Sequence, residues 1–172
     1  MKNILKALII LPLLLSATCE DDCTTNNQFV EDLIEVYPQG NIYEQGDIIT
    51  LQLVIPSLND YFGEGTNLLE STNDIEAEVI LRFDDLFSGN ELTFIRGEQG
   101  THQNKFIIPY YEDSDSYELI FQVTLNKLGY YSIHSSSNDI SFSHLNSCND
   151  FHLETTISGL VPPYDLTFSV IE

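Results

Sequence analysis

The sequence predicts an all-β protein, an antiparallel β-sandwich of two sheets with about seven to nine strands. Several short runs have an apolar residue at every second position, which is the pattern of strands that bury one face. Clusters of Gly, Pro, Asn and Ser separate these runs as turn signals, and no long segment has a helical period. The 172 residues, 42% of them hydrophobic, are enough for one domain with its own core.

The clearest alternation occurs in five runs, at residues 47–55, 75–83, 117–125, 151–157 and 166–170. In the second run, Ala77 and Val79 fall on one face while Glu76 and Glu78 fall on the other. Many apolar residues in these runs are β-branched or aromatic, which favours strands. Weaker strands are expected at residues 33–37, 91–96, 105–110 and 130–134, and one helical turn is expected within 67–73.

The number and spacing of these strands resemble an immunoglobulin-like fold, and residues 128–131 (Leu-Gly-Tyr-Tyr) resemble the Gly-Tyr entry to a late strand of such domains. The resemblance implies an immunoglobulin-like sandwich over residues 29–172, although the chain has no Trp for a Cys…Trp…Cys core. A jelly roll is the alternative. No internal repeat divides the chain, so we expect a single domain.

Acidic residues outnumber Lys and Arg by 27 to 6, which gives a net charge of -21. Binding to nucleic acid, or by charge alone to anionic lipid, requires clustered Lys and Arg, and the sequence has no such cluster. The charge therefore excludes nucleic acid as a partner.

Residues 1–18 have the form of a secretory signal peptide. Lys2 and Lys6 precede the apolar run 7–15, which is too short to span a bilayer as a helix. Small and polar residues then lead to Cys19, and the segment resembles the lipobox of bacterial lipoproteins. The resemblance implies that Cys19 carries the lipid and that cleavage falls directly before it; an ordinary secretory signal is the alternative.

Glu20, Asp21 and Asp22 follow directly and resemble the acidic export signal of some outer-membrane lipoproteins. The resemblance implies a membrane anchor through Cys19 at the outer membrane, with the protein facing the cell exterior; a solvated tail is the alternative. Residues 19–28 are then the lipidated Cys and an acidic and polar tether. Loss of the signal removes two of the six cations, so the mature chain carries a charge of -23.

Cys23 and Cys148 are the pair that remains when Cys19 is lipidated. An even number of cysteines in an oxidising compartment suggests a disulfide, and two unpaired thiols are the alternative. His144 and His152 flank Cys148 at a spacing of four residues, which would also suit a thiol–imidazole pair or a zinc site. Both of these compete with the disulfide for one sulfur atom.

The acidic loop at residues 112–116 is a candidate calcium site. Glu112, Asp113 and Asp115 lie together between two expected strands, and Ca²⁺ prefers oxygen ligands. The alternative is a solvated loop whose charges keep strand edges from pairing with other chains.

Three tyrosines, Tyr61, Tyr110 and Tyr111, lie near expected loops and carboxylates. Aromatic faces beside carboxylates suit a ligand-binding site for a glycan. The absence of Trp, the usual stacking residue, counts against this interpretation.

No motif predicts catalysis: the chain has no Gly-x-Ser-x-Gly elbow, and spacing along the sequence cannot position a glycosidase carboxylate pair. We expect a non-enzymatic surface lipoprotein that acts as a binding or accessory subunit of an outer-membrane assembly, with a protein partner. A glycan-binding module, assisted by calcium, is the alternative, and a hydrolase is a distant one. The subunit hypothesis predicts that four apolar residues at outward positions form one exposed patch: Ile48, Val54, Ile80 and Ile120.

Overall fold

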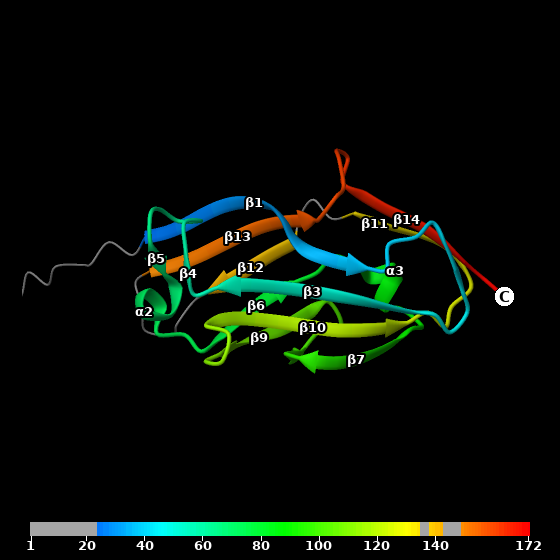
Figure 1. Ribbon diagram of the computed structural model, residues 1–172, viewed down its shortest axis with the longest axis horizontal. Coiled ribbons are helices and arrows are strands. Elements are labelled where there is room, and N and C mark those ends of the chain that lie inside the picture. Colours follow the sequence, from blue (N-terminus) through cyan, green and yellow to red (C-terminus); the bar gives the residue numbers. More distant parts are fainter. Residues whose placement is uncertain (1–23, 135–137, 143–148) are drawn as a thin grey trace, which may run out of the picture.

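The computed structural model describes residues 24–134, 138–142 and 149–172, which form an all-β structure (Figure 1). Two short helices interrupt the strands, and no helix of the described residues is long and apolar enough to cross a bilayer. The elements, in chain order, are β1 (Thr24–Tyr37), β2 (Ile42–Glu44), β3 (Ile48–Pro56), β4 (Leu58–Asn59), β5 (Thr66–Asn67), α2 (Leu68–Thr72), β6 (Glu76–Ile80), α3 (Asp84–Phe87), β7 (Glu91–Arg96), β8 (Glu98–Gln99), β9 (Lys105–Tyr111), β10 (Ser116–Thr124), β11 (Gly129–His134), β12 (Asn138–Phe142), β13 (Asn149–Ile157) and β14 (Asp165–Ile171).

Nine strands form one continuous sheet in the order β7-β10-β3-β1-β13-β12-β6-β9-β8. β9 also pairs with β10, so the sheet closes on itself. β10 and β12 are not neighbours in this order, yet the rings of Tyr117 and Phe142 pack edge to face at 5.0 Å. The closed sheet is therefore flattened into two layers, one with β3, β10 and β7 and the other with β13, β12, β6, β9 and β8.

The core between the layers is rich in aromatic rings. Phe106 of β9 and Phe121 of β10 are stacked with centroids 5.3 Å apart, and Phe94 packs against both of them. Phe106 and Phe121 are fully buried, together with the inward side chains of β3 and β6. The alternation seen in the sequence thus places one face of the long strands β3, β9 and β10 in this core.

β1 joins the two layers at one edge, because its two halves pair with different strands. Its first half runs parallel to β13, and its last four residues run antiparallel to β3. Between them the chain bulges at Asp32, which has a φ of +66°. The amides of Asp32 and Leu33 donate to the hydroxyls of Thr156 (3.1 Å) and Thr155 (3.2 Å). Both threonines are fully buried, and their hydroxyls satisfy amides that the bulge takes out of the ladder.

The opposite edge closes where β7 continues into β8 through Gly97. β7 pairs with β10 in one layer, and β8 pairs with β9 in the other. Gly97 has a φ of +79°, and a Cβ atom there would lie 2.7 Å from Cδ1 of Leu119 and 2.8 Å from the carbonyl oxygen of Ile107. Glycine is therefore required where the chain passes from one layer to the other.

A separate three-stranded sheet, in the order β11-β14-β2, lies at the end of the long axis where the chain terminates (Figure 1). Its inner face is buried through Tyr131, Phe168 and Tyr43, whose rings pack with centroid distances of 4.8 and 5.1 Å. The side chain of Asn90 fixes the approach to β11, because it accepts from the amides of Asn126 (2.8 Å) and Lys127 (3.0 Å).

The expected strands are confirmed at nearly all positions, and the expected helical turn is α2, capped by Asn67 and Asn73. Other expectations are corrected. Two strand pairs, β1–β13 and β14–β2, are parallel, because alternation does not encode the direction of pairing. The layers are joined into one sheet, and the topology does not confirm the immunoglobulin-like arrangement. Residues 24–28, expected in the tether, belong to β1, since their backbone pairs with β13.

Gly97→Ala should destabilise the fold more than Gly159→Ala. Both glycines have a φ of +79°, but a Cβ at position 159 meets no atom within 4 Å. The two variants therefore share the backbone strain, and they differ in the clash with Leu119 and Ile107. We expect Gly97→Ala to lower the free energy of unfolding by about 1–3 kcal/mol more than its control, measured by urea denaturation. Equal losses in the two variants would contradict the close approach at this edge.

Candidate functional site

Six of the residues expected to have a role lie outside the described residues: Cys19, Glu20, Asp21, Asp22, Cys23 and Cys148. Lipidation, export and the disulfide therefore stay predictions. Cys148 and His144, two members of the alternative zinc or thiol–imidazole site, also lie outside them. The third member, His152, is on β13, where its Nδ1 lies 3.7 Å from Oδ1 of Asp139.

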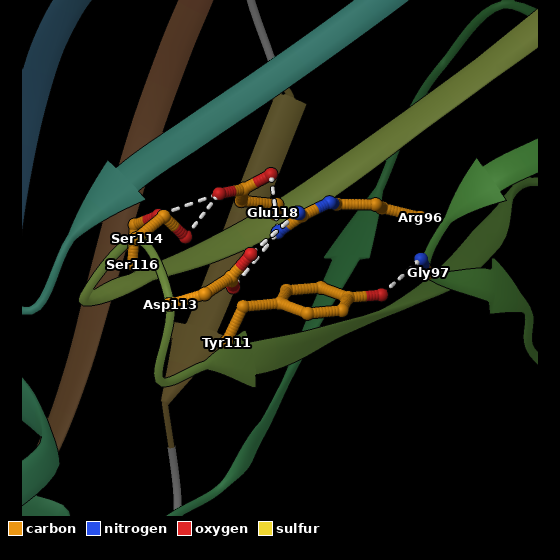
Figure 2. Close-up of polar contacts among 7 residues, drawn as sticks. All are labelled: Arg96, Gly97, Tyr111, Asp113, Ser114, Ser116 and Glu118. Carbon is orange, nitrogen blue, oxygen red and sulfur yellow. Dashed lines mark hydrogen bonds and ion pairs between the residues drawn. The ribbon is translucent and has the colours of Figure 1, made fainter.

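Side chains of the acidic loop at residues 112–116 form an ion pair and hydrogen bonds with residues of β7 and β10 (Figure 2). Arg96 at the end of β7 contacts both carboxylate oxygens of Asp113, with Nη2–Oδ2 at 3.0 Å and Nη1–Oδ1 at 3.4 Å. Nη1 of Arg96 also lies 3.1 Å from Oε2 of the buried Glu118, whose other oxygen accepts from the hydroxyls of Ser114 and Ser116. The loop is thus held against β7, next to the edge closed by Gly97.

These contacts shift the titration of the loop carboxyls. The Arg96 guanidinium, hydrogen-bonded to Asp113, holds the pKa of the Asp113 carboxyl below its ordinary value. The hydroxyls of Ser57 and Tyr110 both donate to Oδ1 of Asp115, the second at 2.8 Å, and lower its pKa in the same way. Both carboxylates are therefore engaged by groups of the protein.

The calcium prediction gains no support from this geometry. Asp113 is committed to Arg96 and Asp115 to two hydroxyls, so neither is held ready for a cation together with Glu112. Over residues 24–134, 138–142 and 149–172, the structure has no group of three or more His, Cys, Asp and Glu side chains placed to hold a metal ion. Calcium binding at Glu112, Asp113 and Asp115 stays a prediction.

The three tyrosines expected to bind a ligand have structural contacts. The guanidinium of Arg96 lies 4.3 Å from the ring centroid of Tyr111, whose hydroxyl accepts from the amide of Gly97 at 3.1 Å. Tyr110 donates to Asp115, and this hydrogen bond raises its pKa. Tyr61 is packed against the core, and burial raises its pKa. Tyr110 and Tyr111 thus bind groups at the edge of the sandwich, and Tyr61 packs against the core.

The four outward apolar residues do not form one patch. Val54 and Ile120 lie on the neighbouring strands β3 and β10, but Ile48 lies at the opposite end of β3, beside Thr124. Ile80 lies on β6, which is in the other layer and pairs with β9 and β12. The expectation is wrong because the sheet closes in an order that separates β6 from β3.

A different apolar surface lies on the free face of the three-stranded sheet. Tyr130 of β11 and Ile42 of β2 flank Ser169 in register, and they are 69% and 66% exposed. Ile171, two residues beyond Ser169 on the same face, is 50% exposed, and Leu128, directly before β11, is 42% exposed. We call these four apolar residues the distal patch. Grouped apolar side chains of this kind mark a protein-interaction site more often than scattered ones do.

Acidic groups border the distal patch. Glu44 is the register partner of Ile171, Glu172 follows it, and both are exposed. Asp47 lies in the adjoining turn, where its carboxylate accepts from the amide of Glu44 at 2.8 Å. The patch is therefore an apolar centre with a mainly negative rim, although the exposed Lys127 precedes Leu128.

No pattern in the sequence predicts this patch. β2 has only three residues, too few for a visible period, and Tyr130 and Tyr131 are adjacent aromatics of which only one can face the core. The opposite burial of these two tyrosines, 69% exposed against 2%, is decided by the pairing with β14.

Comparisons with known proteins found one structural likeness and no sequence match. No protein-family model matches it, and no curated protein matches it. One solved structure that it resembles is a crystal structure of the seventh ScaB type I cohesin from Pseudobacteroides cellulosolvens. The sequences are 10% identical, the match covers 82% of this chain and 93% of that one, and the TM-score is 0.30. A likeness at that TM-score carries no argument about function.

Asp113→Asn should make the free energy of unfolding less dependent on pH under acidic conditions. A carboxyl whose pKa is lower in the folded state contributes stability that is present above its unfolded pKa, about 4, and is lost as the pH falls through the folded value. The wild-type free energy of unfolding should therefore fall more steeply than that of the variant below about pH 4. The difference is small because the side chain of Asp113 is 67% exposed, so water screens the ion pair.

The measurement is urea denaturation at a series of pH values. Glu91→Gln, at an exposed position of β7, removes one negative charge without touching Arg96 and serves as the control. If the free energy of unfolding of Asp113→Asn falls below about pH 4 as steeply as that of the wild type, the ion pair with Arg96 is contradicted.

Proposed function

We propose that this chain is a non-enzymatic, lipid-anchored binding subunit at the outer membrane. The distal patch, at the end of the molecule opposite the start of β1, is the single observation that carries this proposal. Cys19 provides the anchor, the sandwich acts as a spacer, and the three-stranded sheet presents the patch to a protein partner on the cell exterior.

The arrangement of the two ends supports presentation away from a membrane. β1 begins at one end of the long axis, whereas the C-terminus and the three-stranded sheet lie at the other end (Figure 1). Cys19 precedes Thr24 by five residues, a length of chain that spans at most about 18 Å. A lipid on Cys19 would keep the start of β1 near the bilayer and leave the distal patch remote from it.

The surface of the patch defines the partner by its chemistry. Tyr130 supplies a large ring with a polar end, and Ile42 and Ile171 supply aliphatic contact beside it. The rim is acidic, and the whole chain carries a charge of -21, so charge complementarity favours a partner with an apolar centre and a basic rim. We therefore propose a protein with surface Lys and Arg around an exposed apolar cluster.

Cys19→Ala should release the protein from membranes, because it removes the only residue on which the lipid is proposed to form. The measurement is fractionation of cells followed by immunoblotting of soluble and membrane fractions. Cys23→Ala is the matched control, since it removes the next thiol and should leave the protein in the membrane fraction. Retention of Cys19→Ala in membranes would contradict the lipid anchor.

The double variant Ile42→Ser/Tyr130→Ser should lose the partner. Proteins captured by the wild type from mild-detergent membrane extracts are identified, and the purified partner is then titrated against both forms. We expect the affinity to fall at least about tenfold, because the variant removes the two most exposed apolar side chains of the patch. The association rate of the wild type should also fall with added salt.

Ile75→Ser/Tyr37→Ser is the matched control, because it removes an isoleucine and a tyrosine that are 66% and 44% exposed on other elements. Its affinity should equal that of the wild type. A partner that binds the patch variant as tightly as the wild type would overturn the assignment of the patch, and so would an acidic partner whose binding strengthens with salt.

A further inference from the structure

A hollow of about 410 Å³ lies on the outer face of the layer that contains β13 and β12. It shares no residue with the distal patch. Residues 27–29 of β1, His152 and Glu154 of β13, Asp139 of β12 and Arg82 beyond β6 line it. Its volume is in the range of pockets that bind small organic ligands. None of the residues expected to bind calcium or a glycan belongs to it.

Register explains why these residues meet. Phe29 of β1 lies beside Glu154 of β13, which in turn lies opposite Asp139 of β12. In the next outward row, Asn27 lies beside His152. The parallel pairing of β1 with β13 thus places an aromatic ring, two carboxylates, an amide and an imidazole on one face.

The hollow contains both donors and acceptors next to an exposed ring. Asp139 and Glu154 accept hydrogen bonds, and Asn27 and His152 can both donate and accept. Phe29 is 49% exposed although it is a large apolar side chain. A ring in this position offers an apolar face to a ligand whose edge reaches the polar groups.

The charges of the lining exclude some ligands. Two carboxylates face one guanidinium, and the whole chain carries a charge of -21, so an anionic ligand such as a phosphate or a sulfated sugar is repelled. A purely apolar ligand would displace water from the carboxylates of Asp139 and Glu154 and offer them no hydrogen-bond donor. The lining fits a molecule that has several hydroxyl groups and no negative charge.

We propose that this hollow binds a neutral saccharide of one or a few sugar units. Adjacent hydroxyls of the sugar donate to Asp139 and Glu154 and accept from Asn27 and His152. The C–H face of the ring packs on Phe29. The site is separate from the distal patch, and a sugar bound there leaves the patch free for its protein partner.

The test uses the full-length protein in mild detergent and a panel of neutral oligosaccharides (glucans, mannans and xylans), with sialylated and sulfated glycans beside them. Binding is measured by calorimetry, and its place by shifts of backbone amide resonances. We expect at least one neutral oligosaccharide to bind, with shifts concentrated at residues 27–29, 139 and 152–154. Anionic glycans should not bind.

Phe29→Ala and Asp139→Asn should each weaken binding at least about tenfold. Tyr37→Ala removes an aromatic ring of similar exposure from the other half of β1, and Glu98→Gln removes an exposed carboxylate from β8; both should bind as the wild type does. Thermal denaturation of each variant shows whether it is folded. If Phe29→Ala is unstable, Asp139→Asn alone decides, because it keeps the size of the side chain.

Three results would overturn the proposal: no neutral saccharide binds, binding is unchanged in both Phe29→Ala and Asp139→Asn, or the shifts fall elsewhere. Tighter binding of an anionic glycan or of a free amino acid would also overturn it. The patch variant Ile42→Ser/Tyr130→Ser should bind the saccharide normally, so failure here is distinguishable from failure of the proposed partner binding.

Discussion

The sandwich depends on the hydrogen bonds that hold β1 where it crosses from one layer to the other. The fully buried hydroxyls of Thr155 and Thr156 accept hydrogen bonds from the amides of Leu33 and Asp32. These bonds satisfy two amides that the bulge removes from the strand pairing, and each contributes about 1 kcal/mol. Because β1 is the strand between β13 and β3, this bulge fixes the register of both layers and the curvature that closes the sheet.

The other edge is closed by a charged cluster, and this explains the acidic loop between β9 and β10. Arg96 bridges Asp113 and the buried Glu118 and stacks on Tyr111, while Gly97 lets the backbone pass between Leu119 and Ile107. Asp113 and Asp115, expected to bind calcium, and Tyr110 and Tyr111, expected to bind a glycan, therefore contact other groups of the protein. In this loop, carboxylates beside aromatic rings stabilise a corner of the fold, whereas the hollow beside Phe29 presents similar groups to solvent.

The same closure also separates the two surfaces to which we assign functions. The hollow lies on the face formed by β1, β13 and β12, and the distal patch lies on a different sheet at the end of the long axis. Each has a distinct chemistry, one polar with a single exposed ring and the other apolar with an acidic rim. The two surfaces share no residue, so a sugar in the hollow and a protein on the distal patch would not compete for the same contacts.

Local patterns in the sequence were sufficient for the all-β class, for most strand positions and for the helical turn of α2, because these patterns involve residues close in the chain. The sequence also determined the net charge of -21 and the absence of clustered Lys and Arg. Only the tertiary structure decided that β1 pairs in parallel with β13, that Asp113 meets Arg96, and that Phe29 lies beside Glu154. Each of these contacts joins segments that are distant in the sequence. Their register depends on how the whole sheet closes over its core, and no short stretch of sequence encodes that closure.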